Sequence, residues 1–200
     1  MKGLLLKDFY IVRSLLLYLA VVFLVLGISM SYLVTPWVLP VIATIMLGMN
    51  VPGTINMDKS SGWLKTVMTL PVSRRMYLSS KYVMYLLTSL AGFLLGGALA
   101  IVAAQVTGKG VEDSAIFICI SLTMALMSGS VLMPCYFLLG EEKSILGTVL
   151  AYPASAGVFV LLNLIFGKAS YVPAVSVAVG AVMYGISWYV SGRILSGKDV

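Results

Sequence analysis

Six runs of apolar residues, each about 20 residues long, determine what this chain can fold into. A helix needs roughly 20 apolar residues to cross about 30 Å of hydrocarbon, and only short polar segments separate these runs. Charged residues make up 10% of the chain, against about 25% in a soluble globular protein. The sequence therefore predicts an all-α integral membrane protein with a single transmembrane domain, residues 1–200. The six predicted spans cover residues 15–34, 37–56, 83–106, 114–139, 144–166 and 171–192, each boundary being approximate.

The distribution of Lys and Arg predicts which side of the membrane each segment faces. Of the 13 basic residues, 11 lie on one predicted side, and only Lys109 and Lys168 lie on the other. Basic residues accumulate on the cytoplasmic side of a membrane, so both termini are predicted to be cytoplasmic. The net charge of +6 is therefore assigned to topology and not to binding of nucleic acid. The predicted cytoplasmic segments are 1–14, 57–82, 140–143 and 193–200.

Residues 1–14 have the composition of a helix that lies at the membrane surface. Charged residues, among them Lys7 and Asp8, alternate with leucines and aromatic residues that would gather on one side of a helix. A signal peptide is the competing interpretation, but it needs a short apolar region and a small-residue cleavage site. The run that follows is long enough to be a full span. We therefore expect an uncleaved interfacial helix ahead of the first span.

The residue types that most catalytic and metal sites need are missing from the sequence. The chain has no histidine, and Cys119 and Cys135 lie in apolar runs. It also lacks the G-x-x-x-x-G-K-[ST] phosphate loop, so a separate subunit would have to bind and hydrolyse any ATP. No Asp, Glu, Lys, Arg or His falls within the predicted spans, which argues against proton-coupled transport. We therefore expect a non-catalytic subunit without a cofactor or a metal.

The longest polar segment, residues 57–82, is the predicted contact with soluble partners. It contains five of the basic residues and a single acid, Asp58. Residues 60–70 can form a short amphipathic helix, Pro71 would end it, and Ser73 can cap the helix that follows. From these residues alone, two roles are equally supported. The short helix could dock in a groove of a soluble partner, or it could lie on the anionic inner leaflet.

Three sequence motifs resemble those of the ABC-2 type permeases of ATP-binding-cassette exporters. They are MKGLLLKDFY at the start, Leu70-Pro71-Val72-Ser73-Arg74 ahead of Lys81-Tyr82, and Gly140-Glu141-Glu142-Lys143 after the fourth span. More narrowly, the chain is similar to short six-span bacterial permeases, which include exporters of phenol-soluble modulins and bacteriocins. The resemblance extends over the whole length and includes the order of the spans.

The resemblance implies an interfacial N-terminal helix and a coupling helix, residues 58–70, that docks on an ABC ATPase subunit. It also implies an assembly of two ATPase subunits and two permease chains, as a homodimer or a heterodimer, in the bacterial cytoplasmic membrane. The residues expected to contact the ATPase are Trp63, Leu64, Val67 and Met68. A candidate secondary contact on the cytoplasmic side consists of Glu141, Glu142 and Lys143.

Polar and small residues within the spans indicate where helices bend or approach one another. Prolines in the second span predict a kinked helix that faces protein or a cavity. Asn50 and Asn56 in this span are our candidates for the translocation path, and Pro153 predicts an interruption of the fifth span. The small residues of the third span that would allow a close helix contact are Gly92, Gly96 and Gly97.

We therefore expect the permease subunit of an exporter that moves amphipathic or hydrophobic molecules, peptides among them, out of a bacterial cell. One alternative is the membrane substrate-binding component of a nutrient importer, which would bind a vitamin-sized ligand tightly on its own. Another is a non-transporting scaffold or immunity protein, which would not affect a partner's ATPase activity.

Overall fold

Helices form nearly all of the described part of the chain. The computed structural model describes residues 2–33, 35–69, 72–108, 114–139, 141–166 and 171–197. Within these ranges helices are the only regular elements, which confirms the predicted all-α class. They are α1 (Lys2–Leu33), α2 (Val38–Gly48), α3 (Asn50–Ser60), α4 (Trp63–Thr69), α5 (Arg74–Thr107), α6 (Ser114–Leu138), α7 (Glu141–Phe166) and α8 (Val172–Gly197).

The number of helical segments that could cross a membrane agrees with the sequence. Five segments are long and apolar enough, and α2 and α3 together form one of them. A sixth is α1, if its two parts Lys2–Arg13 and Leu15–Val25, which meet with a bend of 47°, form one span. The bend falls where the interfacial helix was expected to join the first span. The five candidate spans are Val38–Ser60, Arg74–Thr107, Ser114–Leu138, Lys143–Phe166 and Val172–Leu195.

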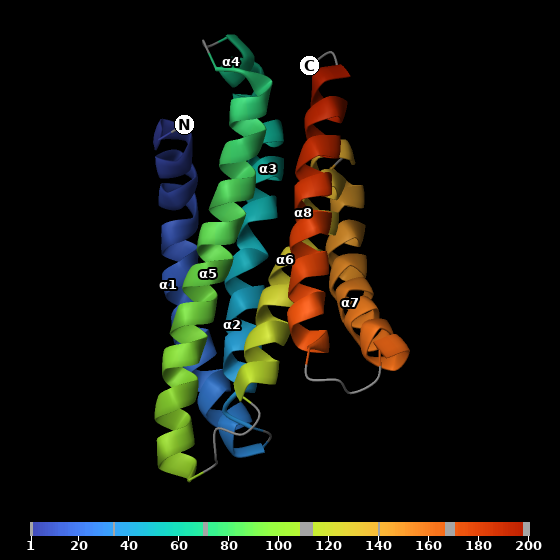
Figure 1. Cartoon of the computed structure of the whole chain (residues 1–200). Helices are drawn as coiled ribbons and strands as arrows, with labels where there is room; N and C mark the ends of the chain where they lie inside the picture. The colour runs from blue at the N-terminus through green and yellow to red at the C-terminus, as the bar shows by residue number, and fades with distance from the viewer. Residues whose placement is uncertain are drawn as a thin grey trace.

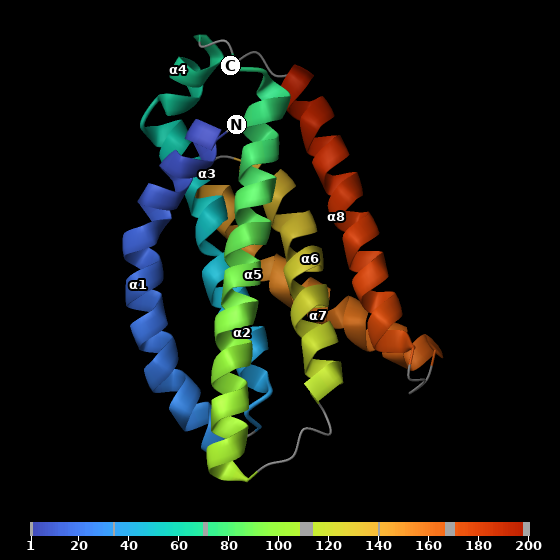
Figure 2. The ribbon, with the colours of Figure 1, turned by 60° about the vertical axis from the view of Figure 1, so that its left-hand side comes forward.

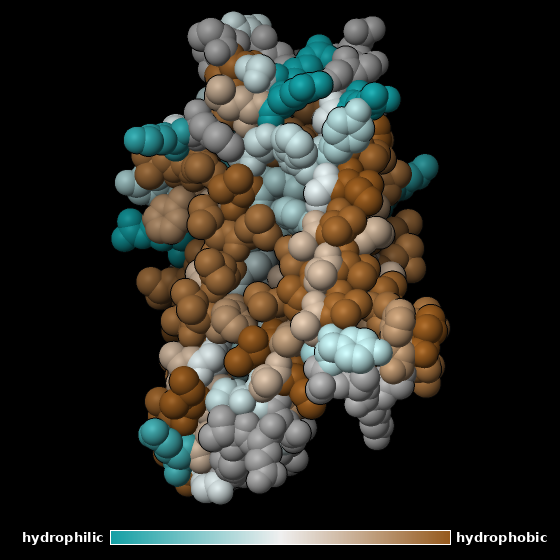
Figure 3. Space-filling model, in the orientation of Figure 1, coloured by the Kyte–Doolittle hydropathy of each residue, from teal (hydrophilic) through white to brown (hydrophobic). Residues whose placement is uncertain are grey.

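The elements that carry most of the basic residues lie at one end of the bundle. Figures 1 and 2 show the start of α1, the whole of α4 and the end of α8 at this end. In Figure 3, hydrophilic side chains gather there, and a broad apolar band lies below them. We call this the basic end. It is the end that the distribution of Lys and Arg assigns to the cytoplasm.

The second predicted span is divided into α2 and α3 at Met49. Pro52 has no N–H to donate, and its ring would clash with the carbonyl of the residue four positions earlier, Gly48. The amide of Asn50 donates to the carbonyl of Met46 at 2.7 Å and that of Leu47 at 3.4 Å. The side chain thus occupies carbonyls at the end of α2, and the predicted kink takes the form of a break in the helix.

Helices α2 and α5 pack closely because glycines line the contact between them. A Cβ atom on Gly92 would lie 2.8 Å from the carbonyl carbon of Ala43, and one on Gly96 would lie 2.7 Å from the carbonyl oxygen of Leu39. At Gly97 a Cβ atom would meet nothing within 4 Å. The small-residue face predicted for this span is therefore confirmed for Gly92 and Gly96, while Gly97 points away from α2.

Helix α7 is continuous through Pro153, although an interruption was predicted there. Proline removes one hydrogen bond from the helix, but the neighbouring carbonyls of a lipid-facing segment have no water to bind instead. The helix therefore keeps its remaining bonds. The same holds for α6, which contains Pro134 and makes its most extensive contacts with α8.

We predict that Gly92→Ala destabilises the chain, whereas Gly97→Ala does not. Alanine in a helix is favoured over glycine by about 0.5–1 kcal/mol, but overpacking costs about 1–3 kcal/mol. Only the first position is overpacked, because only there does the added methyl group meet backbone atoms of α2. Thermal unfolding of both variants in detergent is the measurement. Equal melting temperatures for the two variants would contradict the close contact.

Candidate functional site

A buried lysine joins three helices at the basic end of the bundle. The ammonium nitrogen of Lys81, on α5, lies 2.7 Å from a carboxylate oxygen of Asp8, on α1. It also lies 2.7 Å from a carboxylate oxygen of Asp58, on α3. The side chain of Lys81 is 1% exposed and both carboxylates are 2% exposed. Helices α1, α3 and α5 are therefore joined through the ammonium group of Lys81.

Neighbouring side chains complete the polar surroundings of these charges. Lys81 also donates to the hydroxyl of Thr54 at 2.9 Å. The hydroxyl of Tyr77 donates to Asp58 at 2.9 Å, and Lys7 forms a second ion pair with Asp58. Two cations and two carboxylates give a net charge of zero. We call Lys7, Asp8, Asp58 and Lys81 the ionic cluster.

The ionic cluster was not foreseen from the sequence. We had placed Asp58 and Lys81 in a polar segment, but α3 continues to Ser60 and α5 begins at Arg74. Both residues therefore belong to helices that carry candidate spans. A buried charge is stable only when it is paired and hydrogen-bonded, and the cluster meets this requirement. The start of α5 agrees with the sequence, because Ser73 accepts a hydrogen bond from the backbone N–H of Met76.

Helix α3 is held by contacts to the other side of the bundle as well. The ammonium group of Lys59 donates to the carbonyl oxygens of Tyr136 at 2.6 Å and Leu139 at 2.9 Å. These carbonyls belong to the C-terminal end of α6, where a cation is favoured by the helix dipole. The amide of Asn56 donates to the hydroxyl of Ser144 on α7 at 2.8 Å. Polar contacts of α3 therefore reach α1, α5, α6 and α7.

Helix α4 follows α3 directly and packs against the bundle through its apolar side. The backbone at Gly62 has a φ of 72°, a conformation that favours glycine, and this turn separates the two helices. Val67 is 0% exposed in the core that includes Tyr77, and Trp63 and Leu64 are half-buried against the same core. The ammonium of Lys7 lies 4.8 Å from the ring centre of Trp63, which connects α4 to the ionic cluster.

This packing changes which side of α4 faces outward. Val67 was expected to contact an ATPase, but it is fully buried within this chain and is not on the surface. That expectation is corrected, since an amphipathic helix buries its apolar face in its own core when that core is available. Among the described side chains of the helix, those of Thr66 and Thr69 are exposed. The side chain of Met68, like residues Leu70 and Pro71, lies outside the described part of the chain.

The candidate secondary contact lies at the first turn of α7. Lys143 is exposed there, next to the basic end of the bundle. Glu141 and Glu142 lie in the same turn, but their side chains are not among those described. Acidic residues at this position are favoured by the positive end of the helix dipole.

The two asparagines considered for the path both donate hydrogen bonds within the chain. Asn50 binds carbonyls of α2, and Asn56 binds Ser144 of α7. Both side chains are half-buried. Their part in a translocation path stays a prediction.

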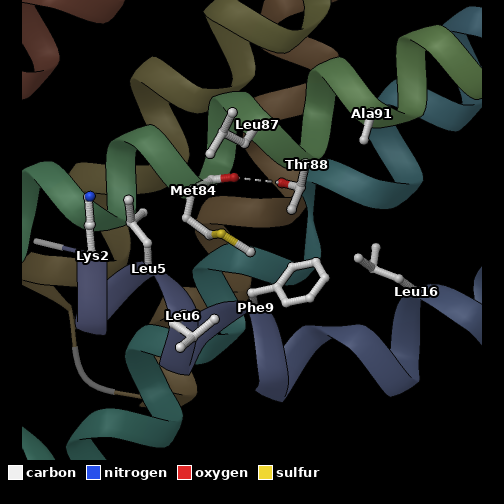
Figure 4. A pocket seen from close by; sticks show the side chains of 9 residues that line it. All are labelled: Lys2, Leu5, Leu6, Phe9, Leu16, Met84, Leu87, Thr88 and Ala91. Carbon is white, nitrogen blue, oxygen red and sulfur yellow. Dashed lines mark hydrogen bonds between the residues drawn. The ribbon is translucent and has the colours of Figure 1, made fainter.

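An apolar groove opens where the first part of α1 lies beside α5. The groove has a volume of about 450 Å³. Figure 4 shows Leu5, Phe9, Leu16 and Met84 around it, with Lys2 at one end. Among the described side chains of its lining, the hydroxyl of Thr88 donates to the carbonyl of Met84. The exposed leucines and Phe9 beside the groove suit contact with acyl chains. Hydrophobic molecules dissolved in the bilayer would have direct access to it.

We predict that Lys81→Met lowers the stability of the chain by about 3–5 kcal/mol, because it leaves the carboxylate of Asp8 buried without its closest cation. The double variant with Asp8→Asn removes this charge and should recover part of the loss. Lys143→Met, at an exposed position, is the control and should have no effect. Thermal unfolding in detergent is the measurement. An unchanged melting temperature for Lys81→Met would contradict the role of the ionic cluster.

Comparison with known protein families identifies the family of this chain. A family model described as ABC-2 family transporter protein matches residues 3–196. No curated protein and no solved structure shows a significant match to the chain. Membrane permeases of the ABC-2 family generally pair with ABC ATPase subunits, and ATP hydrolysis resides in that partner. The match covers nearly all of the helices described above, so this chain belongs to the ABC-2 family and is a membrane-spanning permease component of a transporter.

Proposed function

We propose that the chain is the permease subunit of an exporter and that α4 is the helix through which its ATPase partner acts. The position of α4 at the basic end carries this proposal. It is joined to α3 through a two-residue turn at Ser61 and Gly62, and α3 has polar contacts to four other helices. A displacement of α4 would therefore reach most of the bundle.

Coupling requires that the ATPase contacts the permease differently in its two states. Two ATPase subunits would close on binding ATP and move the α4 helices of two permease chains. A ligand shifts a conformational equilibrium only if it binds the two conformations differently, and a docked helix that moves with its partner satisfies this condition. The permease pair, a homodimer or a heterodimer in the bacterial cytoplasmic membrane, would then change from inward-facing to outward-facing.

For the cargo we propose amphipathic or hydrophobic molecules, with peptides of the modulin or bacteriocin type as the first candidates. The apolar groove between α1 and α5 supports this choice. Its lining is almost entirely hydrocarbon, and Lys2 adds a single cation at one end. A molecule with an apolar body and an acidic or polar end would fit such a lining.

We predict that Thr66→Tyr, on the outward side of α4, reduces the amount of co-purified ATPase at least tenfold, a loss of about 1.4 kcal/mol. The added ring would separate two surfaces that must lie in contact. Co-purification from native membranes is the measurement. Gln105→Tyr, at an exposed position near the other end of α5, is the matched control and should retain the ATPase.

Two results of this experiment would contradict the proposal. If no ATPase accompanies the unmodified chain, the chain does not act in an ABC transporter of the expected composition. If the ATPase still co-purifies with the Thr66→Tyr variant, α4 is not the docking helix. The exposed start of α7 at Lys143 is then the next position to test.

We predict that inside-out membrane vesicles containing the complete transporter accumulate a labelled amphipathic peptide only when ATP is supplied. Export from the cell corresponds to uptake by such vesicles. Ala91→Trp, which fills the apolar groove, should reduce this uptake severalfold, whereas Val106→Trp, exposed elsewhere on α5, should not. Uptake only into right-side-out vesicles would indicate import instead.

A further inference from the structure

A small pocket with two arginines lies between α5 and α8 at the basic end. Its volume is about 200 Å³, and it is separate from the ionic cluster and the apolar groove. Within the described part of the chain its lining contains two cations and no carboxylate. The lining residues are Arg75, Leu78, Trp188, Tyr189, Gly192 and Arg193.

One contact to α5 and one within α8 orient the aromatic residues of the pocket. The indole N–H of Trp188 donates to the hydroxyl of Ser79 on α5 at 3.1 Å. The guanidinium carbon of Arg193 lies 5.2 Å from the ring centre of Tyr189, a distance typical of a cation–π contact. Both rings remain partly exposed, Trp188 at 43% and Tyr189 at 54%. Gly192 also lines the pocket, and a Cβ atom there would meet nothing within 4 Å.

The position of the pocket along the bundle places it near lipid headgroups. Helix α5 has 34 residues, about 50 Å at 1.5 Å per residue, whereas the hydrocarbon core is about 30 Å thick. The helix therefore extends beyond the hydrocarbon, and its first turns are the end expected outside, because Arg74 and Arg75 are costly to bury in lipid. Trp and Tyr are enriched at this level of a membrane. Figure 3 shows hydrophilic side chains gathered at this end of the face formed by α5 and α8.

We propose that this pocket binds the phosphate of an anionic phospholipid from the cytoplasmic leaflet. A guanidinium group matches the geometry of a phosphate and can donate two hydrogen bonds to it. Arg75 would approach the phosphate from α5 and Arg193 from α8, while the rings of Trp188 and Tyr189 border the glycerol region. The bound lipid would join the start of α5 to the end of α8. The site does not depend on the identity of the transported molecule.

The test measures which lipid lies next to Trp188. The variant Trp37→Phe/Trp63→Phe leaves Trp188 as the only tryptophan, and lipids with brominated acyl chains quench its fluorescence on contact. Vesicles contain either brominated phosphatidylglycerol or brominated phosphatidylcholine at equal bromine content. Both lipids carry a phosphate, but the choline group cancels its charge in phosphatidylcholine. We therefore expect phosphatidylglycerol to bind more tightly, by about fivefold for each arginine in the pocket.

Two substitutions distinguish the pocket from the general charge of this surface. Arg75→Gln/Arg193→Gln should make the two lipids quench equally, whereas Arg13→Gln, at an exposed position on α1, should leave the preference unchanged. Equal quenching by both lipids before any arginine is replaced would overturn the proposal, whatever the stability of the variants. So would loss of the preference in millimolar inorganic phosphate, which would show a site for free phosphate. A preference that appears only after removal of a bound ATPase would assign the arginines to acidic residues of that partner instead.

Discussion

The burial of the Lys81 ammonium is the constraint on which the basic end of the bundle depends. An unpaired ammonium group in a medium of low dielectric constant is too costly to persist, so two carboxylates must approach it. One of these, Asp8, comes from α1, and the other, Asp58, comes from α3. The ion pairs alone therefore hold α1, α3 and the start of α5 together, and apolar contacts add to this. Lys59 connects α3 to the end of α6 as well, because it donates hydrogen bonds to the carbonyls of Tyr136 and Leu139.

The fold could be predicted from the sequence to the extent that it follows from local patterns. The spans follow from hydropathy, the cap at Ser73 from a serine ahead of a helical segment, and the contact at Gly92 from the spacing of small residues. The ionic cluster could not be found in this way. Asp8, Asp58 and Lys81 lie far apart in the sequence, and a basic residue near a span is a normal signal of membrane topology. Only the packing of three helices shows that these charges neutralise one another.

The same reasoning explains why the apolar side of α4 was assigned to a partner and not to the chain itself. The pattern at Trp63 and Val67 shows that one side of the helix is buried, but it does not show which surface buries it. In the structure this surface is the core around Tyr77, and Lys7 lies over the ring of Trp63. A helix anchored in this way moves together with its own bundle. This would suit the coupling role proposed above, because an anchored helix transmits a displacement to the bundle and does not rotate in place.

These contacts also restrict how the permease can change conformation. Separating α1, α3 and α5 at the basic end would expose or unpair at least one buried charge, at a cost of several kcal/mol. Helix α7 is held differently, since its candidate span has the smallest buried share and, among the described residues, the hydrogen bond from Asn56 to Ser144 connects it with α3. A neutral hydrogen bond contributes only about 1 kcal/mol. If an ATPase acts through α4, as proposed above, the motion that needs the least free energy moves α1, α3, α4 and α5 as one rigid body and changes the boundary with α7.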